Sequence, residues 1–191
     1  AIQGLPTAVS IATADMALGR ELAAALAAGA FRPYWTNDVM GVALGGAIKN
    51  VLAIAAGIAE GRGLGHNATA ALITRGFAEM ARLGTAMGAS LETMTGLSGI
   101  GDIVLTCSGP LSRNRALGVA LGKGTALATH MAGRRQVVEG EATAPAVLAR
   151  AARHGIEMPI CAAVDAILHH GADLDDAIRA LLTRPLRREG E

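Results

Sequence analysis

Residues 39–59 read VMGVALGGAIKNVLAIAAGIA, an almost wholly apolar run with Lys49 and Asn50 near its middle. The run is long enough for a buried helix, and a lysine inside such a helix is costly unless another group pairs with it. As a membrane span, the run would carry that lysine at a cost of roughly 2.5–3.5 kcal/mol. Its flanks have no aromatic belt, so we expect a buried helix and no integral membrane span.

Lys49 itself has two interpretations. In the first, its methylene stem lies along the core while the amine reaches the surface. In the second, the amine is withdrawn from water, its pKa falls towards neutrality, and a nearby carboxylate holds it, so that it exchanges protons at working pH. Glycines lower helix stability, so we expect another backbone or a ligand to approach this helix closely where its glycines lie (Gly41, Gly45, Gly46 and Gly57).

The composition excludes several classes of protein. Half of the 191 residues are hydrophobic, which allows one sizeable core, whereas aromatic residues make up 2% and the net charge is +1. A nucleic-acid partner is therefore not expected. Cys107 and Cys161 form neither a disulfide framework nor a metal-binding pattern, so no metal is expected and a reducing compartment fits. The opening AIQGLPTAV has no basic signal region, and we expect a cytoplasmic location.

The order of patterns predicts a mainly α protein: a multi-helix bundle preceded by a short βαβ-like piece. Residues 7–13 and 31–36 read as strands, and between them a helix begins after Asp15 and ends at Gly29. From residue 39 we expect seven or eight helices. The clearest begin at Asn37 or Asp38, Asn67, Leu91, Ser112, Thr143, Pro159, and Asp173 or Asp175. Residues 96–101 read as a loop, and residues 102–107 as a strand or, more consistent with their neighbours, a helix.

Three further groups of residues could carry chemistry. Asp102 is either a helix cap or the counter-charge that a buried Lys49 needs. Ser112, Arg113 and Asn114 offer a hydroxyl, a guanidinium and an amide at a helix start, which suits a phosphate, although their spacing alone slightly favours a capped and solvated surface helix. Glu139, where a loop meets a helix, is a weak signal when taken alone.

Four long motifs resemble one family. GVALGGAIKNVLAIAAGIAEG, NATAALITRGFAEM, GLSGIGDIVLTC and SRNRALG occur in the order and spacing of bacterial-type NAD(P)-dependent glycerol-3-phosphate dehydrogenases, and the likeness extends from GLPTAVSIAT to MPICAAV. No GxGxxG loop occurs in these residues. The resemblance therefore implies that residues 1–38 are the C-terminal end of a Rossmann domain and residues 39–191 an all-α substrate-binding, catalytic domain.

The resemblance also implies roles for single residues. Lys49 matches the lysine that transfers a proton to or from the substrate, and Asn50 and Thr106 lie in matching motifs as secondary contacts. The remaining matches are substrate-binding (Asp102, Ser112, Arg113 and Asn114) and cofactor-binding (Arg113, Val137 and Glu139).

The implied reaction interconverts sn-glycerol 3-phosphate and dihydroxyacetone phosphate with NAD or NADP and feeds glycerophospholipid synthesis. A small phosphate substrate and a possible homodimer follow from the same resemblance. Because the phosphate-binding glycine loop supplies much of the cofactor affinity, we expect these 191 residues alone to be inactive. The alternatives are a β-hydroxyacid-dehydrogenase-like helical domain, in which lysine and asparagine lie one turn apart, or a non-enzymatic helical dimerisation module.

Overall fold

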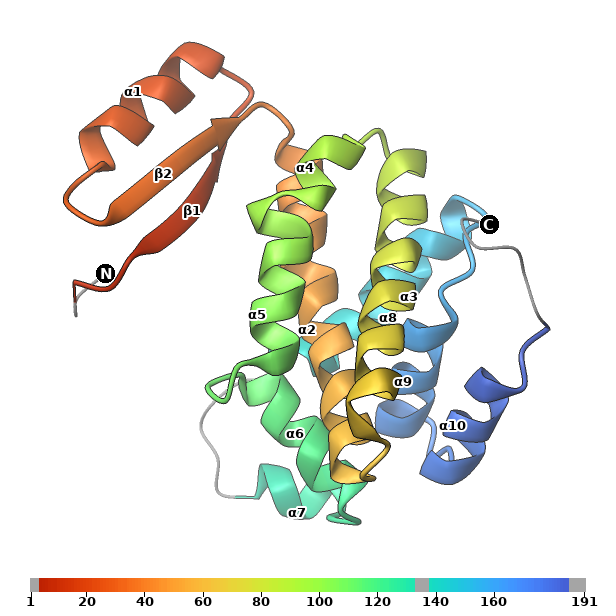
Figure 1. Ribbon diagram of the computed structural model, residues 1–191. Helices are drawn as coiled ribbons and strands as arrows, with labels where there is room; N and C mark the ends of the chain where they lie inside the picture. Colours follow the sequence, from red (N-terminus) through yellow and green to blue (C-terminus); the bar gives the residue numbers. More distant parts are fainter. Residues whose placement is uncertain (1–3, 133–137, 186–191) are drawn as a thin grey trace.

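The computed structural model describes residues 4–132 and 138–185, and a small α/β piece stands beside a helical body (Figure 1). The elements of the α/β piece are β1 (Thr7–Ala12), α1 (Met16–Leu26) and β2 (Phe31–Thr36). The helical body contains α2 (Val39–Gly61), α3 (Gly65–Ala86), α4 (Leu91–Thr95), a π-helical turn (Leu97–Gly101), α5 (Asp102–Ser108), α6 (Arg113–Gly122), α7 (Leu127–Met131), α8 (Glu139–Arg153), α9 (Pro159–His169) and α10 (Leu174–Leu182). The predicted fold class, a mainly α bundle after a βαβ-like piece, is confirmed.

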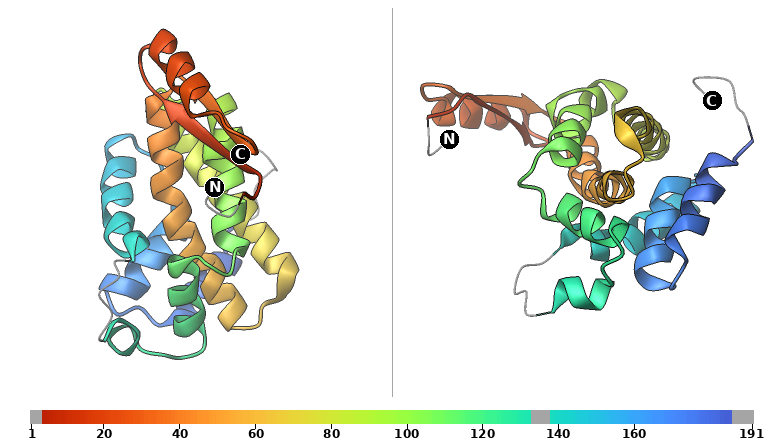
Figure 2. Two further views of the ribbon diagram at one scale, coloured as in Figure 1. Left: turned by 90° about the vertical axis from the view of Figure 1, so that its left-hand side faces the viewer. Right: turned by 60° about the horizontal axis from the view of Figure 1, so that its bottom comes forward.

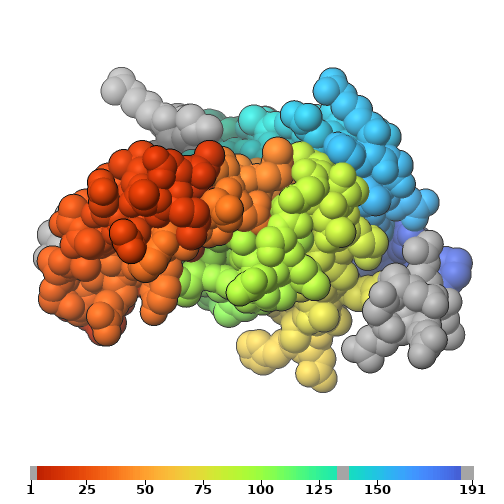
Figure 3. Space-filling model, turned by 90° about the horizontal axis from the view of Figure 1, so that it is seen from above, coloured from red at the N-terminus to blue at the C-terminus, as the bar shows by residue number. Residues whose placement is uncertain are grey.

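The α/β piece is one parallel βαβ unit. Strands β1 and β2 pair in parallel from Thr7 opposite Phe31 onward, and α1 makes the crossover between them. Helix α1 begins where the sequence predicts, because a side-chain oxygen of Asp15 accepts the amides of residues 17 and 18 at 2.8 and 3.1 Å. It ends at Leu26, before the predicted Gly29. The chain's single tryptophan, Trp35, lies in β2 and is 43% exposed. Seen from above, this piece forms a lobe at one end of the molecule (Figure 3).

Helix α2 is the central element of the helical body (Figure 2). By length and composition it could cross a membrane, but 72% of its most apolar window is buried within the chain. Every residue from Val51 to Ala59 is buried, which is the packing of a core helix. Asp38 resolves the open question of its start: one carboxylate oxygen accepts the amide of Gly41 at 2.7 Å, and the other accepts that of Ser90 at 2.8 Å. This carboxylate therefore joins the start of α2 to the start of α4.

Helices α2 and α6 touch backbone to backbone. A Cβ atom at Gly118 would lie 2.9 Å from the Cα atom of Gly57, and one at Gly122 would lie 2.9 Å from that of Gly61. Two glycines one turn apart on each helix therefore set the separation of the pair. The expectation that another backbone approaches α2 at its glycines is confirmed at Gly57, whereas Gly46 faces open space.

Several boundaries differ from the predictions. Residues 97–101 form a π-helical turn in place of the expected loop. The sequence did not predict α7. The described residues after Thr36 therefore hold nine α-helices in place of the expected seven or eight. Helix α3 begins two residues before Asn67, at a start without any side-chain cap to signal it.

Helix α8 begins four residues before the predicted Thr143, and Pro145 therefore lies inside it. A proline has no amide to bond the carbonyl four residues earlier. Here that carbonyl belongs to Glu141, and His169 Nε2 lies 3.0 Å from it. A side chain from α9 thus satisfies the acceptor that the proline leaves open, which the sequence of α8 alone could not indicate.

Candidate active site

The Lys49 amine meets a carboxylate from a different helix. Lys49 Nζ lies 2.6 Å from Asp102 Oδ2, so α2 and α5 are joined by a hydrogen-bonded ion pair. The side chains are 25% and 34% exposed, respectively. The counter-charge expected for Lys49 is therefore present, and Asp102 makes no capping bond at the start of α5. The amine is half-buried, so it is held in place by protein while remaining open to a small molecule.

The π-helical turn determines where Asp102 stands. This turn packs directly on α2 one helical turn before Lys49, because Gly45 has no side chain: a Cβ there would lie 3.1 Å from the carbonyl carbon of Ser98. Helix α5 starts where the turn ends, which brings its first residue opposite the lysine. The hydroxyl of Thr106 donates to the carbonyl of Asp102 at 2.6 Å. Thr106 therefore supports α5, and its hydroxyl is already engaged.

A second polar cluster joins α2, α6 and α8. Asn50 Nδ2 donates to Glu139 Oε2 at 3.0 Å, and Asn114 Nδ2 donates to Asn50 Oδ1 at 2.9 Å. The amide of Gly140 in turn donates to Asn114 Oδ1 at 2.9 Å. Asn114 is 8% exposed and both ends of its side-chain amide are used by the protein. In this structure Asn114 therefore holds three helices together, and its amide is not directed at solvent.

Asn50 carries more of this cluster than its sequence context indicated. It is 7% exposed and lies within an apolar helix. A buried polar side chain is costly without a hydrogen-bond partner, so Asn50 needs a partner just as Lys49 does. The identity of that partner could not be predicted, because Asn114 and Glu139 lie far along the chain. Gly140 was also missed as a contact; a Cβ there would lie 2.8 Å from Asn114 Oδ1.

The start of α6 combines a cap and an exposed cation. Ser112 Oγ accepts a hydrogen bond from the amide of Arg115 at 3.2 Å. The serine therefore caps the helix, which is the second of the two interpretations given for it. Arg115 forms an ion pair with Glu60, whereas Arg113 is exposed and has no ion pair among residues 4–132 and 138–185. The structure does not bring Arg113 into contact with the Lys49 pair. Val137, a predicted cofactor contact, lies outside the described residues.

Two cavities of the described chain lie apart from this ion pair. One, of about 750 Å³, is lined mainly by α2, α3, α9 and α10. The other, of about 490 Å³, lies between the strands and the turn that leads to α5, and its lining includes Thr36 and Ser98. Neither is lined by Lys49 or Asp102.

Comparison with known proteins gives a consistent result. The family model described as the C-terminus of NAD-dependent glycerol-3-phosphate dehydrogenase matches residues 38–179. A relative from Maricaulis maris, named glycerol-3-phosphate dehydrogenase [NAD(P)+], is 58% identical over 187 residues, which are 98% of this chain and 56% of that protein. A relative of the same name from Caulobacter vibrioides is 56% identical, with the same coverage. The chain thus spans about half the length of the curated relatives it matches.

Solved structures agree with this assignment. The crystal structure of glycerol-3-phosphate dehydrogenase from Coxiella burnetii superimposes with a TM-score of 0.88 at 46% identity, over 95% of this chain and 56% of that one. The enzyme of the same name from Plasmodium falciparum, at 19% identity, shares the fold with a TM-score of 0.84 over 97% of this chain and 54% of that one. The chain therefore belongs to the family of the C-terminal region of NAD-dependent glycerol-3-phosphate dehydrogenases.

Proposed function

We propose that this chain is the substrate-binding and proton-transfer part of an NAD(P)-dependent glycerol-3-phosphate dehydrogenase. The reaction interconverts sn-glycerol 3-phosphate and dihydroxyacetone phosphate. The family and the names of its relatives support this proposal. The single observation that carries it is the contact of 2.6 Å between Lys49 Nζ and Asp102 Oδ2 on an accessible face.

Lys49 moves the proton in this mechanism. In the direction of oxidation its amine takes the proton from the C2 hydroxyl of the substrate, and in the direction of reduction its ammonium returns a proton to the carbonyl oxygen. Asp102 holds the nitrogen in position and balances its charge when the proton is bound. The nicotinamide cofactor, when bound, accepts or supplies the hydride.

The start of α6 supplies the phosphate contact. Arg113 presents an exposed guanidinium beside the free amides of a ten-residue helix, and both favour a phosphate group. Ser112 lies next to it as the cap. Asn114 acts here by fixing α6 against α2, so that Arg113 keeps its position relative to Lys49. Arg113, Val137 and Glu139 are the residues that we expect to reach the cofactor.

The exposed surface of the α/β piece supports a larger dinucleotide-binding domain. Parallel sheets are normally covered on both faces, and two strands with one helix are too few for independent stability. Here Leu22, Leu26, Tyr34 and Trp35 are all at least 40% exposed. We therefore assign residues 1–38 to such a domain and residues 39–191 to the substrate domain, and expect a polypeptide of these 191 residues alone to show no turnover.

The test replaces Lys49 in a protein with both domains. A suitable protein is a chimaera in which the part of the Maricaulis maris relative that this chain does not match precedes the chain. Lys49→Met should lower kcat for dihydroxyacetone phosphate reduction by roughly 10²- to 10⁴-fold, the usual contribution of a general acid. The chain's other lysine, Lys123, is exposed at the end of α6, so Lys123→Met is the matched control.

Three outcomes separate the alternatives. Unchanged turnover in a folded Lys49→Met protein would reject the proposed role of Lys49, and unchanged turnover with lost self-association would favour a dimerisation module. That module has little support, since the glycines of α2 at positions 45, 57 and 61 are covered by the chain's own backbone. Turnover of a β-hydroxyacid in place of the phosphate substrate would favour the other enzyme class. A homodimer, a cytoplasmic location and a role in glycerophospholipid synthesis remain predictions.

A further inference from the structure

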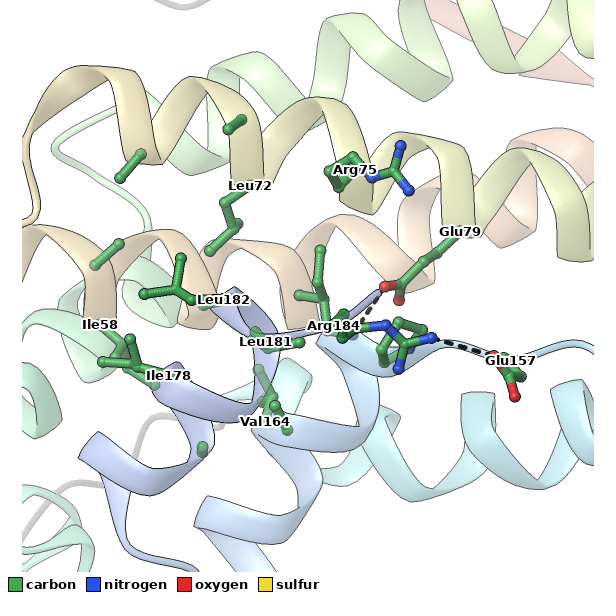
Figure 4. A pocket seen from close by; sticks show the side chains of 18 of the residues that line it. Ile58, Leu72, Arg75, Glu79, Glu157, Val164, Ile178, Leu181, Leu182 and Arg184 are labelled. Carbon is green, nitrogen blue, oxygen red and sulfur yellow. Dashed lines mark hydrogen bonds and ion pairs between the residues drawn. The ribbon is translucent and has the colours of Figure 1, made fainter. Parts of the chain in front are cut away.

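Figure 4 shows the cavity of about 750 Å³ in the helical body, which neither Lys49 nor Asp102 lines. Its walls come from the C-terminal half of α2 and from α3, α9 and α10, and none of the proposed substrate or cofactor residues within the described ranges lines it. Its volume falls within the range of pockets that enclose small ligands, about 300–1,000 Å³. The cavity therefore has the size of a site for a small ligand.

One end of the cavity is apolar. Ile58 of α2, Leu72 of α3, and Ile178 and Leu182 of α10 gather there, as Figure 4 shows. Helix α10 has no buried residue, although its apolar side chains face this space, and Leu182 is 77% exposed. Apolar side chains that face a gap lack the dispersion contacts of a packed core. An apolar chain between α10 and the other helices would restore these contacts.

The other end of the cavity is charged. Arg75 and Glu79 of α3 lie there with Glu157 and Arg184. Glu79 is 2% exposed, and its two oxygens accept the amides of residues 160 and 161, at the start of α9, at 2.8 and 3.4 Å. Glu157 forms an ion pair of 3.2 Å with Arg184. Both carboxylates at this end are therefore already engaged by the protein.

The arginines at this end exceed the carboxylates. Arg75, Arg82 and Arg184 line the cavity together with the two engaged glutamates. Arg82 lies close enough to Glu79 to lower its pKa, and Arg184 has its own carboxylate. Within the described part of the chain Arg75 has no ion pair, so its guanidinium is the group that can take an anion from a ligand.

We propose that this cavity binds a single-chain amphiphile with an anionic head group, of the fatty-acid type. The chain lies between α10 and the apolar faces of α2, α3 and α9, and the head group lies at Arg75. The residues of this cavity and those of the Lys49 pair do not overlap, so binding here can be measured separately from turnover.

The experiment measures binding of decanoate, below its micellar concentration, to the 191-residue chain by isothermal titration calorimetry. We expect saturable binding of one decanoate per chain. Arg75→Ala should weaken it roughly tenfold, since a charge-assisted hydrogen bond is lost, while binding of the neutral 1-decanol stays unchanged. Arg150→Ala removes an exposed arginine of α8 outside the cavity and should leave both affinities unchanged.

A second pair of variants fills the cavity. Ala163→Phe on α9 and Ala177→Phe on α10 both place a ring in the space, so each should abolish binding of decanoate and 1-decanol. Two positions are used so that misfolding of one variant leaves the other as the test.

No saturable decanoate binding to the unchanged chain would overturn the proposal, as would full affinity in both folded phenylalanine variants. Equal affinity of decanoate for the unchanged chain and for Arg75→Ala would overturn the assignment of the anionic head group to Arg75. A dimer that decanoate dissociates in sedimentation would instead assign the cavity to a second copy of the chain.

Discussion

Helix α2 meets α6 and α10 in contrasting ways. Towards α6 its glycines let two backbones touch, and the oxygen and nitrogen of the neighbouring Asn50 and Asn114 side-chain amides all have hydrogen-bond partners. Towards α10, Ile58 faces a cavity of about 750 Å³. Both contacts involve the same helix, so helix propensity cannot explain the difference between them. The difference comes from the size of the side chains that α2 presents to each partner.

The contrast separates two requirements of a binding protein. Transfer of a proton needs groups held to within a fraction of an ångström, and beside Lys49 the close backbone contact of the π-helical turn with α2 at Gly45 supports this. Accommodation of a ligand needs room, and the loosely packed α10 leaves it. Each of the following predictions changes one side of α2.

The largest effect is expected where the two backbones touch. Gly57→Ala would place a Cβ 2.8 Å from Val119 N and 2.9 Å from the Cα of Gly118, so α6 must move away, which should destabilise the protein by about 3 kcal/mol. Gly46→Ala is the matched control on the same helix. No atom lies within 4 Å of a Cβ there, so it should stabilise the protein by about 0.5–1 kcal/mol. Urea unfolding measures both, and destabilisation by Gly46→Ala equal to that by Gly57→Ala would contradict the backbone contact.

The next effect concerns Glu79 on the α10 side. Burial raises its pKa to about 7 from an ordinary 4.5, and amide hydrogen bonds from residues 160 and 161 and the charge of Arg82 only partly oppose this. The folded state therefore holds the proton more tightly than the unfolded state. The stabilisation is complete below about pH 4.5 and is lost as the pH rises to about 7, a change of up to about 3 kcal/mol.

Glu79→Gln should remove this decline while keeping an oxygen for the amide of Ile160. The measurement is the free energy of unfolding between pH 4.5 and 7.5 for both proteins. Glu21→Gln, at an exposed position of α1, serves as the control and should keep the pH profile of the unchanged chain. If the stability of Glu79→Gln falls with pH as steeply as that of the unchanged chain, the assignment to this carboxyl is wrong.

The smallest effect is expected at Asn114. Asn114→Ala leaves the amide of Gly140 and Oδ1 of Asn50 without partners and should destabilise the protein by about 1–3 kcal/mol. In the two-domain chimaera it should also raise KM for the phosphate substrate, because α6 carries Arg113. Asn67→Ala, at an exposed position of α3, is the control for stability. An unchanged KM in a destabilised Asn114→Ala protein would limit the role of this residue to folding.

The sequence predicted the features that follow from local pattern and from single costly residues. Apolar length predicted α2, and the cost of burying Lys49 predicted a counter-charge, which was one of the two interpretations of Asp102. What the sequence could not predict depends on distant contacts. Glu79 looks like an ordinary polar residue of an amphipathic helix, and only the fold brings the start of α9 to it. The amide of Asn114 was assigned to a substrate, because nothing local shows that Asn50 and Gly140 occupy it.

The position of Trp35 determines what spectroscopy can report about this chain. The sole indole belongs to the two-stranded piece, whereas the helices dominate the far-ultraviolet circular dichroism. Emission on heating would therefore follow the small lobe, and ellipticity would follow the helical body. A change in emission at a lower temperature than the change in ellipticity would mean that the lobe unfolds before the bundle.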